Sequence, residues 1–338
     1  MATQTLSGRQ NLFDVMKLKA PNGGVLDVAN TLSETNDMMK DLSSLPANGG
    51  LFHQGVRTTS LPTAVLVDVG GTWGASKGSR EPFVEALATI RNRFQSPSDV
   101  LKSEGADVSK ALVQAENDDH IESIGQSFCN LIVNGPTIPQ QNAVVGLMGR
   151  APYNAVDSEY CFDVGGSGIN LRSAWLMCPD VNTVHLLYNQ NHPTLGVERE
   201  EKGETFVPVT IAADGSVTAG RWDIIIEYML QQGFCIRDYR AVKRVANIPV
   251  LITPTADLVT NIIRAKLKHP IKLSKQWFLY CDTEVYTQLV LGVNDASQIQ
   301  MSDANVYRTK LPMIGDDIII RRMDALNHAV GAGETEVA

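Results

Sequence analysis

Two glycine-rich stretches, each beginning with an aspartate, are the parts of this chain best suited to bind a phosphate. The first is DVGGT at residues 68–72, which follows the apolar run Ala64 to Val67. The second is DVGGSG at residues 163–168. Glycines let the backbone approach a phosphate closely. A nucleotide-binding loop is therefore one interpretation of these stretches, and a pair of glycine turns is the other.

The first stretch resembles the start of the phosphate-binding hairpin in sugar kinases with the actin-like fold. In those kinases an apolar strand follows the glycines, whereas here Trp73 is followed by the polar sequence GASKGSREP. No GK[ST] follows the second stretch, and no partner catalytic aspartate motif appears at a suitable distance. We favour two glycine turns and keep an actin-like-fold sugar kinase, using residues 68–72, as the alternative function.

The cysteine and histidine residues do not suggest a metal site. The five cysteines form no CxxC pair and mostly lie in apolar runs, which predicts buried, reduced thiols. His185 and His192 have no third and fourth ligand at suitable spacing. No G-x-S-x-G elbow supports a serine nucleophile. We predict no catalytic residue, no cofactor and no metal.

Composition and charge narrow the remaining classes. The 338 residues, 43% hydrophobic and 20% charged, predict a soluble globular chain of roughly two domains. A net charge of −8 disfavours binding to nucleic acid or anionic membranes, except through a local basic patch. The sequence contains no window of ~18 apolar residues, so we predict no membrane-spanning helix. The start MATQTLSGRQ lacks the apolar core of an export signal.

The hydrophobic pattern predicts a mixed α+β chain without a βαβ repeat. The best helix covers residues 107–133, ~1.5 Å per residue and so close to 40 Å long. The other predicted elements are short helices within 8–45, a strand pair in 173–188 turning at Pro179-Asp180, a strand pair in 204–226 turning at Ala213-Asp214-Gly215, a strand from Phe234 to Val245, a helix from Thr255 to Lys268, a strand from Trp277 to Tyr280, a helix from Thr283 to Leu291 and a strand around Ile318-Ile319-Ile320.

Residues 51–94 predict a long hairpin with a glycine-rich end. Its arms are residues 51–61 and 82–94, and the first glycine-rich stretch lies between them. A lone two-stranded hairpin is marginally stable in water, so it needs another surface to lie on. Residues 61–79 contain Pro62, four glycines and Trp73 as the single large aromatic residue, and we expect this part to order itself on a neighbouring molecule.

A charged cluster lies on the strand predicted from Phe234 to Val245. It comprises Arg237-Asp238-Tyr239-Arg240, followed by Lys243 and Arg244. One carboxylate among several cations predicts ion pairs, either within the chain or across a subunit contact. A solvated sheet face explains the pattern equally well, because surface ion pairs contribute little to stability.

Several short motifs occur in a characteristic order: Thr35-Asn36-Asp37, Asn182-Thr183-Val184-His185, Arg237-Asp238-Tyr239-Arg240, Arg244-Val245-Ala246-Asn247-Ile248, Tyr280-Cys281-Asp282 and the run from Gly315 to Leu326. Through these motifs the sequence resembles the major capsid proteins of tailed bacteriophages, in particular a family from short-tailed phages. The resemblance covers most of the chain and depends on the order of the motifs.

The resemblance implies an HK97-like phage capsid fold of the α+β class. On this basis we expect an N-terminal arm at 1–50, an E-loop hairpin at 51–94, and a peripheral domain at 95–165 with its spine helix at 107–133. A mostly axial domain would follow at 166–310. Residues 311–338 would form a return strand to the peripheral domain and a C-terminal tail. Phe94-Gln95-Ser96-Pro97-Ser98 interrupts the family's usual segment between hairpin and spine.

The implied function is that of a major capsid protein, a structural protein and not an enzyme, which self-assembles into the icosahedral shell around phage DNA. Its partners would be copies of itself in pentamers and hexamers, a separate scaffolding protein, a portal protein and a cement protein. It would enclose double-stranded DNA without reading its sequence and would not bind membrane. It would be assembled in the host cytoplasm and located in the virion. The residues expected at subunit contacts are Trp73, Lys77, Arg80, Arg237, Asp238 and Arg240.

Overall fold

The computed structural model of the chain describes residues 34, 36–103, 106–138, 140, 143–157, 159–191, 196–211, 217–251, 256–269, 276–291, 299–301, 312–314, 318–328 and 332–338. The chain divides into two compact units. Unit 1 comprises residues 1–33, 89–128 and 194–231, and unit 2 comprises residues 34–88, 129–193 and 232–338. The helices predicted before residue 33, the turn at 213–215 and His192 lie outside the described residues.

A mixed sheet forms the larger part of unit 2, with strand order β11-β12-β13-β10-β5-β9-β4. Strands β5 and β9 pair antiparallel, whereas β10 with β13 and β4 with β9 are parallel. β5 is buried along its whole length, as expected of a strand covered on both faces. The bounds are β4 Cys161–Asp163, β5 Leu171–Met177, β9 Val242–Pro249, β10 Trp277–Cys281, β11 Ile299–Met301, β12 Pro312–Ile314 and β13 Ile318–Arg322.

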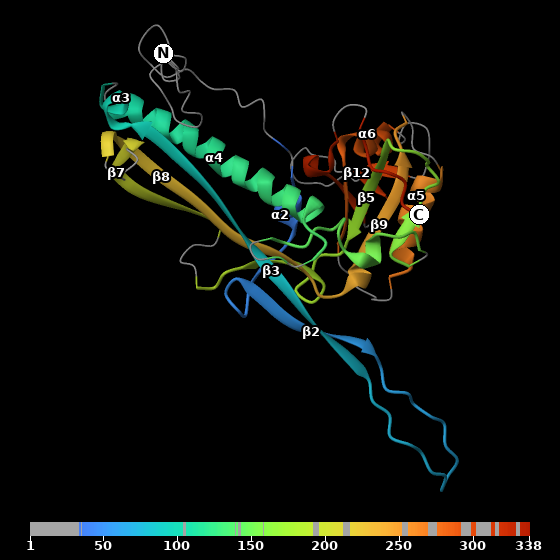
Figure 1. Cartoon of the computed structure of the whole chain (residues 1–338). Coiled ribbons are helices and arrows are strands. Elements are labelled where there is room, and N and C mark those ends of the chain that lie inside the picture. Colours follow the sequence, from blue (N-terminus) through green and yellow to red (C-terminus); the bar gives the residue numbers. More distant parts are fainter. Residues whose placement is uncertain are drawn as a thin grey trace. The chain divides into compact units, whose positions relative to one another are not determined.

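Helices α5 (Ala256–Leu267) and α6 (Thr283–Leu291) pack on one face of this sheet (Figure 1). Alternate strand residues point to the same face, so Leu176 of β5 and Leu279 of β10 join the helices in one buried cluster. Asp282 caps α6, because its carboxylate accepts the Val285 N–H at 2.8 Å.

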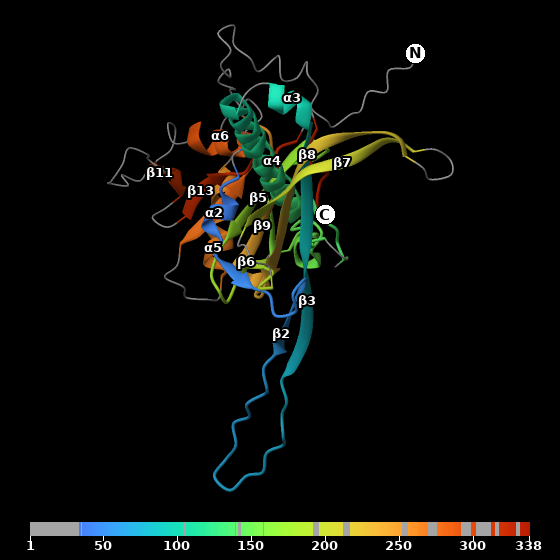
Figure 2. The same ribbon diagram turned by 90° about the vertical axis from the view of Figure 1, so that its left-hand side faces the viewer.

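The rest of unit 2 belongs to a second sheet, in the order β1-β6-β8-β3-β2. In this unit β2 and β3 pair antiparallel from Phe52 opposite Ala86 to Thr58 opposite Arg80 (Figure 2). A short helix, α2 (Met38–Asp41), precedes β1. The strand bounds are β1 Ser44–Pro46, β2 Phe52–Ser60, β3 Ser79–Pro97, β6 Val184–Tyr188 and β8 Val217–Ile236, of which β3 and β8 continue into unit 1.

Unit 1 contains the remaining lengths of β3 and β8 together with β7 (Val197–Ile211), α3 (Ser98–Ser103) and most of α4 (Ala106–Asn134). β7 pairs antiparallel with β8 from Val197 opposite Leu230 to Ile211 opposite Val217. The Tyr228 hydroxyl of β8 donates to Asn117 of α4, and the Tyr228 ring stacks on His120 at 5.1 Å between centroids. These contacts hold α4 against β8 inside this unit.

Most predicted elements are confirmed, and two are wrong. α4, α5, α6, β10, β13 and the β7–β8 pair lie where the hydrophobic pattern placed them. The pair predicted in 173–188 does not form, because β5 and β6 belong to different sheets. The single strand predicted from Phe234 to Val245 is also wrong. β8 ends at Ile236, Asp238 caps the 3₁₀ turn η2 (Tyr239–Ala241), and β9 begins at Val242.

Candidate assembly surface

The base of the β2–β3 hairpin is fixed to unit 2 by Arg57. This residue lies on the half-buried side of β2, whose residues alternate between exposed and partly buried. Its guanidinium carbon lies 4.0 Å from the ring centroid of Phe83 and 4.2 Å from that of Tyr239. The Arg57 Nε donates to the carbonyl of Arg237 at 3.0 Å, and Nη1 donates to the Tyr239 hydroxyl at 3.1 Å. β2 is thereby tied to the loop between β8 and β9.

Beneath this contact Glu85 and Arg150 form a buried, bidentate ion pair. The two guanidinium nitrogens Nη1 and Nη2 donate to the carboxylate at 2.8 and 3.0 Å, and both residues are at most 5% exposed. Arg57 adds a second positive charge 3.7 Å from the same carboxylate. Burial alone would lower the pKa of Arg150, but Glu85 outweighs burial and raises it. This geometry stabilises the charged pair, and losing either partner would leave a buried charge.

Two histidines lie near the same charges. His53 of β2 and His185 of β6 face each other edge to face, with 6.4 Å between ring centroids. The pKa of His185 is lowered to about 4, first by burial and then by the positive charge of Arg237 and by the neighbouring His53. Burial, followed by Arg237, also lowers the pKa of His53, against the opposing effect of Glu85. Both rings are therefore neutral at pH 7.

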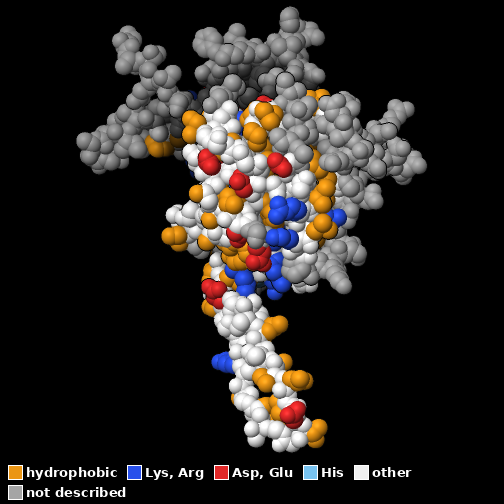
Figure 3. All heavy atoms as spheres, turned by 90° about the vertical axis from the view of Figure 1, so that its right-hand side faces the viewer, with side chains coloured by type: hydrophobic (Ala, Val, Ile, Leu, Met, Phe, Trp, Pro, Cys, Tyr) orange, Lys and Arg blue, Asp and Glu red, His pale blue; other side chains and the backbone are white. Residues whose placement is uncertain are grey.

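The loop at residues 61–78 differs sharply from the base. It carries no helix or strand, and most of its large apolar side chains are exposed (Figure 3). Leu66 and Val69 are fully exposed, and Trp73 is 77% exposed. Figure 3 also shows few charged groups among the hydrophobic side chains of this projecting loop. An apolar surface of this kind on an extended segment is typical of a protein–protein contact.

The DVGGT stretch forms a turn at the end of this loop. Gly71 donates its N–H to the carbonyl of Asp68 at 2.9 Å, and Gly70 has a φ of +89°, which favours glycine. No strand or helix flanks this turn to aim backbone donors at a phosphate.

Lys77 and Arg80 lie where the two arms of the hairpin separate, and they line an open hollow together with Ser60 and Ser79.

The second glycine stretch is also a turn. The Asp163 carboxylate accepts the Gly165 N–H at 2.8 Å, and Gly165 and Gly168 have positive φ values of +88° and +103°. Gly166 donates its N–H to the carbonyl of Asn247 at 3.0 Å, and a Cβ at Gly166 would lie 2.4 Å from that oxygen. Glycine is needed here because the turn packs against β9.

The charged cluster resolves into separate contacts. Asp238 accepts hydrogen bonds from the Arg240 backbone N–H at 3.0 Å and from Arg240 Nε at 2.9 Å. Burial would raise the pKa of Asp238, but the bonds from Arg240 outweigh it and lower that pKa. Lys243 and Arg244 are instead buried within β9. Of the six expected contact residues, Trp73, Lys77 and Arg80 belong to the hairpin, and Arg237, Asp238 and Arg240 lie in or beside the turn that holds its base.

The anchoring residues Arg57, Glu85 and Arg150 were missed at the sequence level. The signal available in the sequence was the two-residue periodicity of β2 and β3, which places the charged residues Arg57 and Glu85 on the inward faces of their strands. Within the described part of the chain, no group of three or more His, Cys, Asp or Glu side chains is arranged to hold a metal ion. No helix among the described residues is long and apolar enough to cross a membrane. The five cysteines are free and buried, as predicted.

An anchored hairpin that ends in an exposed apolar loop is typical of a subunit that assembles with other molecules. A family model for the major capsid protein GP7 matches residues 20–332. The chain belongs to the Major capsid protein GP7 family and forms the capsid shell of a phage virion. The family is structural and not enzymatic, so the expectation of a capsid protein without catalysis is confirmed and the sugar-kinase alternative is abandoned.

Solved structures support the same fold. A chain of bacteriophage Epsilon15, determined by cryo-EM, aligns with a TM-score of 0.72 at 17% identity and covers 99% of this chain and 100% of that chain. The capsid of bacteriophage JBD30 aligns with a TM-score of 0.51 at 9% identity, covering 88% and 93%. These similarities show an HK97-like capsid fold of mixed α/β structure. A search of curated proteins found no match.

Proposed function

We propose that residues 51–94 are the E-loop of this capsid protein, and that the loop 61–78 lies on a neighbouring subunit of the shell. The observation that carries the proposal is the contrast between a base fixed by buried charges and a loop with exposed apolar side chains. Ordering the backbone of a residue costs ~1–2 kcal/mol, which an isolated loop of this composition does not recover. Apolar contact with a neighbouring subunit would offset this free-energy cost.

Trp73 is the proposed anchor of this contact. A tryptophan side chain buries ~150–250 Å² when it enters a pocket, more than any other side chain of the loop offers. Lys77 and Arg80 would then lie near the edge of the contact, where charged groups set orientation more than affinity. Arg237, Asp238 and Arg240 surround the base and would form a second contact region.

The remaining assignments follow the capsid fold. We assign residues 1–50 to the arm, 95–165 to the peripheral domain with spine helix 107–133, 166–310 mostly to the axial domain, and 311–338 to the return strand and tail. The subunits would form pentamers and hexamers, guided by a separate scaffolding protein and joined by portal and cement proteins. The acidic net charge of −8 suits a container that holds DNA without binding it tightly.

Hydrogen exchange compared between isolated subunits and assembled shells tests the E-loop proposal. We expect the amides of residues 61–78 to be unprotected in the subunit and protected in the shell. Amides of β5, buried in both states, provide the internal control. Electron microscopy of the same samples confirms which sample contains closed shells, tubes or capsomers. Equal protection of 61–78 in subunits and shells would show that the loop makes no such contact.

A further inference from the structure

Residues 332–338, called the strap below, run extended along unit 2 and pair with it through the backbone. Glu334 and Leu171 exchange two N–H to carbonyl bonds, at 3.2 and 2.9 Å. Glu336 donates its N–H to the carbonyl of Gly168 at 3.0 Å, and Val156 donates to the carbonyl of Ala338 at 2.9 Å. Glu334 and Leu171 thus form an isolated antiparallel bridge at the start of β5, and the other two bonds join the strap to the loops that contain Gly168 and Val156.

Asn247 extends this pairing with its side chain. Its amide donates to the carbonyl of Val337 at 3.0 Å and accepts the N–H of Val337 at 2.9 Å, so the amide pairs with the strap as a peptide group would. A third bond, from the amide to Asp163, holds it in place at 2.9 Å. Asn247 has a φ of +56°, an unusual conformation for a residue other than glycine.

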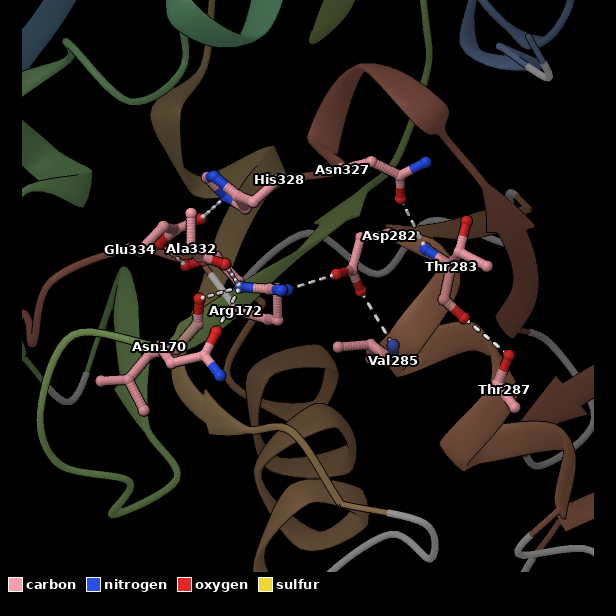
Figure 4. A network of polar contacts seen from close by, with 12 residues as sticks. Asn170, Arg172, Asp282, Thr283, Val285, Thr287, Asn327, His328, Ala332 and Glu334 are labelled. Carbon is pink, nitrogen blue, oxygen red and sulfur yellow. Dashed lines mark hydrogen bonds and ion pairs between the residues drawn. The ribbon is translucent and has the colours of Figure 1, made fainter. Parts of the chain in front are cut away.

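Two buried arginines, Arg244 and Arg172, donate hydrogen bonds to the strap. Arg244, 4% exposed, donates to the Glu334 carboxylate at 2.7 Å, and Ser173 donates to the same oxygen at 2.5 Å. Arg172, 5% exposed, donates to the carbonyl of Ala332 at 2.8 Å and pairs with Asp282 (Figure 4). A buried guanidinium facing the strap requires an acidic side chain at the position of Glu334.

The strap itself lies at the surface. Ala332, Thr335, Glu336 and Ala338 are exposed, and the described residues of the strap do not enter the apolar cluster beneath α5 and α6. The strap is held by hydrogen bonds and by one buried ion pair, Arg244–Glu334, and it buries little apolar surface. A segment with so little apolar burial opens at a lower free energy than the core strands that bind it. Opening would leave β5 and β9 paired, but it would leave the buried Arg244 without its carboxylate, which favours the binding of an acidic segment in the same place.

We propose that this groove, formed by Arg172, Ser173, Arg244, Asn247 and the backbone of residues 168–171, is a binding site for an extended acidic peptide. Its occupant in assembled protein is the strap of a second copy of the chain, which makes the same contacts that the strap makes within one chain. Exchange of an identical segment between copies creates a link at low cost, because every contact is retained.

Binding of a fluorescein-labelled peptide with the sequence of residues 332–338 tests the site, measured by anisotropy on the full-length protein. Val337→Pro removes the N–H that Asn247 accepts and weakens the competing strap without exposing a buried charge. We expect the peptide to bind this variant at least tenfold more tightly than the unchanged protein. Thr335→Ala, at an exposed position of the strap, is the matched control and should bind like the unchanged protein. A peptide carrying Glu334→Gln should bind at least tenfold more weakly.

Exchange between copies is tested by cysteine cross-linking. Chains carrying Val156→Cys are mixed with chains carrying Ala338→Cys, assembled and oxidised; the five native cysteines are buried and do not interfere. A dimer joining the two variants supports exchange. If a chain with both substitutions closes on itself while the mixture yields no dimer, the second-copy occupant is wrong.

Hydrogen exchange on the unchanged protein gives an independent result if Val337→Pro fails to fold. The amides of Glu334 and Glu336 should exchange well before those of β5. Exchange of strap and β5 at the same rate would show that the strap opens only with the core, and would overturn the proposal. Absence of peptide binding to a folded Val337→Pro variant would overturn it as well.

Discussion

The base of the β2–β3 hairpin and the loop at its end are held in opposite ways. At the base, Glu85 lies between two arginines, and the aromatic rings of Phe83 and Tyr239 cover Arg57. In the loop, by contrast, Leu66 and Val69 are fully exposed. One part of a single hairpin is therefore specified by its own chain, whereas we propose that the other part binds a different molecule through its apolar side chains.

This difference separates folding from assembly. A buried ion pair fixes geometry because it tolerates few arrangements, and removing one partner is strongly destabilising. An exposed apolar side chain contributes little to the stability of the subunit, and its burial is gained only on association. Changes at the base should therefore act on the free energy of unfolding, and changes in the loop should act on assembly.

The largest effect is expected from Glu85→Ala. It leaves the buried Arg150 without its carboxylate, so the unfolding free energy of unit 2 should fall by about 3–5 kcal/mol. Urea denaturation of the subunit, followed by circular dichroism, measures the loss. Glu81→Ala, at an exposed position of the same strand, should change stability by less than about 0.5 kcal/mol. Similar losses for both variants would show that the ion pair does not anchor the base.

The second-largest effect is expected from low pH, which should reduce the stability of unit 2 at the base of the hairpin. His185 has a pKa of about 4 in the folded protein and about 6.5 when unfolded, so the unfolded chain binds more protons between these values. The neutral ring is favoured on folding, and stability is lost as the pH falls from about 6.5 toward 4, by at most about 1.4 kcal/mol per pH unit. Arg237 and His53 strengthen this effect, and Asp180 opposes it.

Urea midpoints measured from pH 7 to pH 4 reveal this dependence. His185→Leu removes the titrating ring and should flatten the profile between pH 6.5 and 4, leaving the smaller contribution of His53. If the profiles of the variant and the unchanged protein run parallel, the loss of stability in acid comes from other groups.

Trp73→Ala tests the other side of the comparison. Because the side chain is 77% exposed, the urea midpoint of the subunit should not move. Assembly should weaken by at least about 2 kcal/mol per contact, the size of an interfacial hot spot. Sedimentation of shells against protein concentration measures this shift, and Trp73→Phe should recover part of it. A variant that assembles normally would exclude Trp73 as the anchor.

The sequence predicted the loop better than the base, for a physical reason. The loop is defined by local composition: a proline, four glycines and one tryptophan within residues 61–79 cannot build a core. The base depends on Arg57, Glu85 and Arg150, which are far apart in the sequence and meet only in the folded chain. No local pattern shows which carboxylate a given arginine will find.

The same limit explains the two incorrect strands. β5 and β6 are both short and mostly apolar, and such segments do not indicate which neighbour a strand pairs with. A hairpin was therefore predicted between two strands that belong to different sheets. The break after Ile236 comes from the cap that Asp238 provides, a local turn signal that an apolar pattern on either side concealed. Tertiary strand pairing therefore explains the incorrect hairpin, and turn chemistry explains the incorrect strand from Phe234 to Val245.

The smallest effect is expected from Asp238→Ala, at the border between base and surface. Asp238 caps η2 and thereby positions Tyr239, whose ring covers Arg57. Losing such a cap costs about 1 kcal/mol, and a half-exposed ion pair with Arg240 adds little more, so the subunit should remain folded.

Assembly should nevertheless decline in Asp238→Ala, because Arg240 loses the partner that fixes its side chain at the proposed second contact region. Shell yield and the urea midpoint, measured on the same preparations, separate the two effects. Asp238→Asn keeps an oxygen that can accept the Arg240 N–H but removes the charge. It should preserve the midpoint while lowering shell yield if the ion pair positions Arg240 for a neighbour. A lowered midpoint with unchanged shell yield in both variants would show instead that Asp238 acts only within its own chain, and would place this cluster with the base and not with the assembly surface.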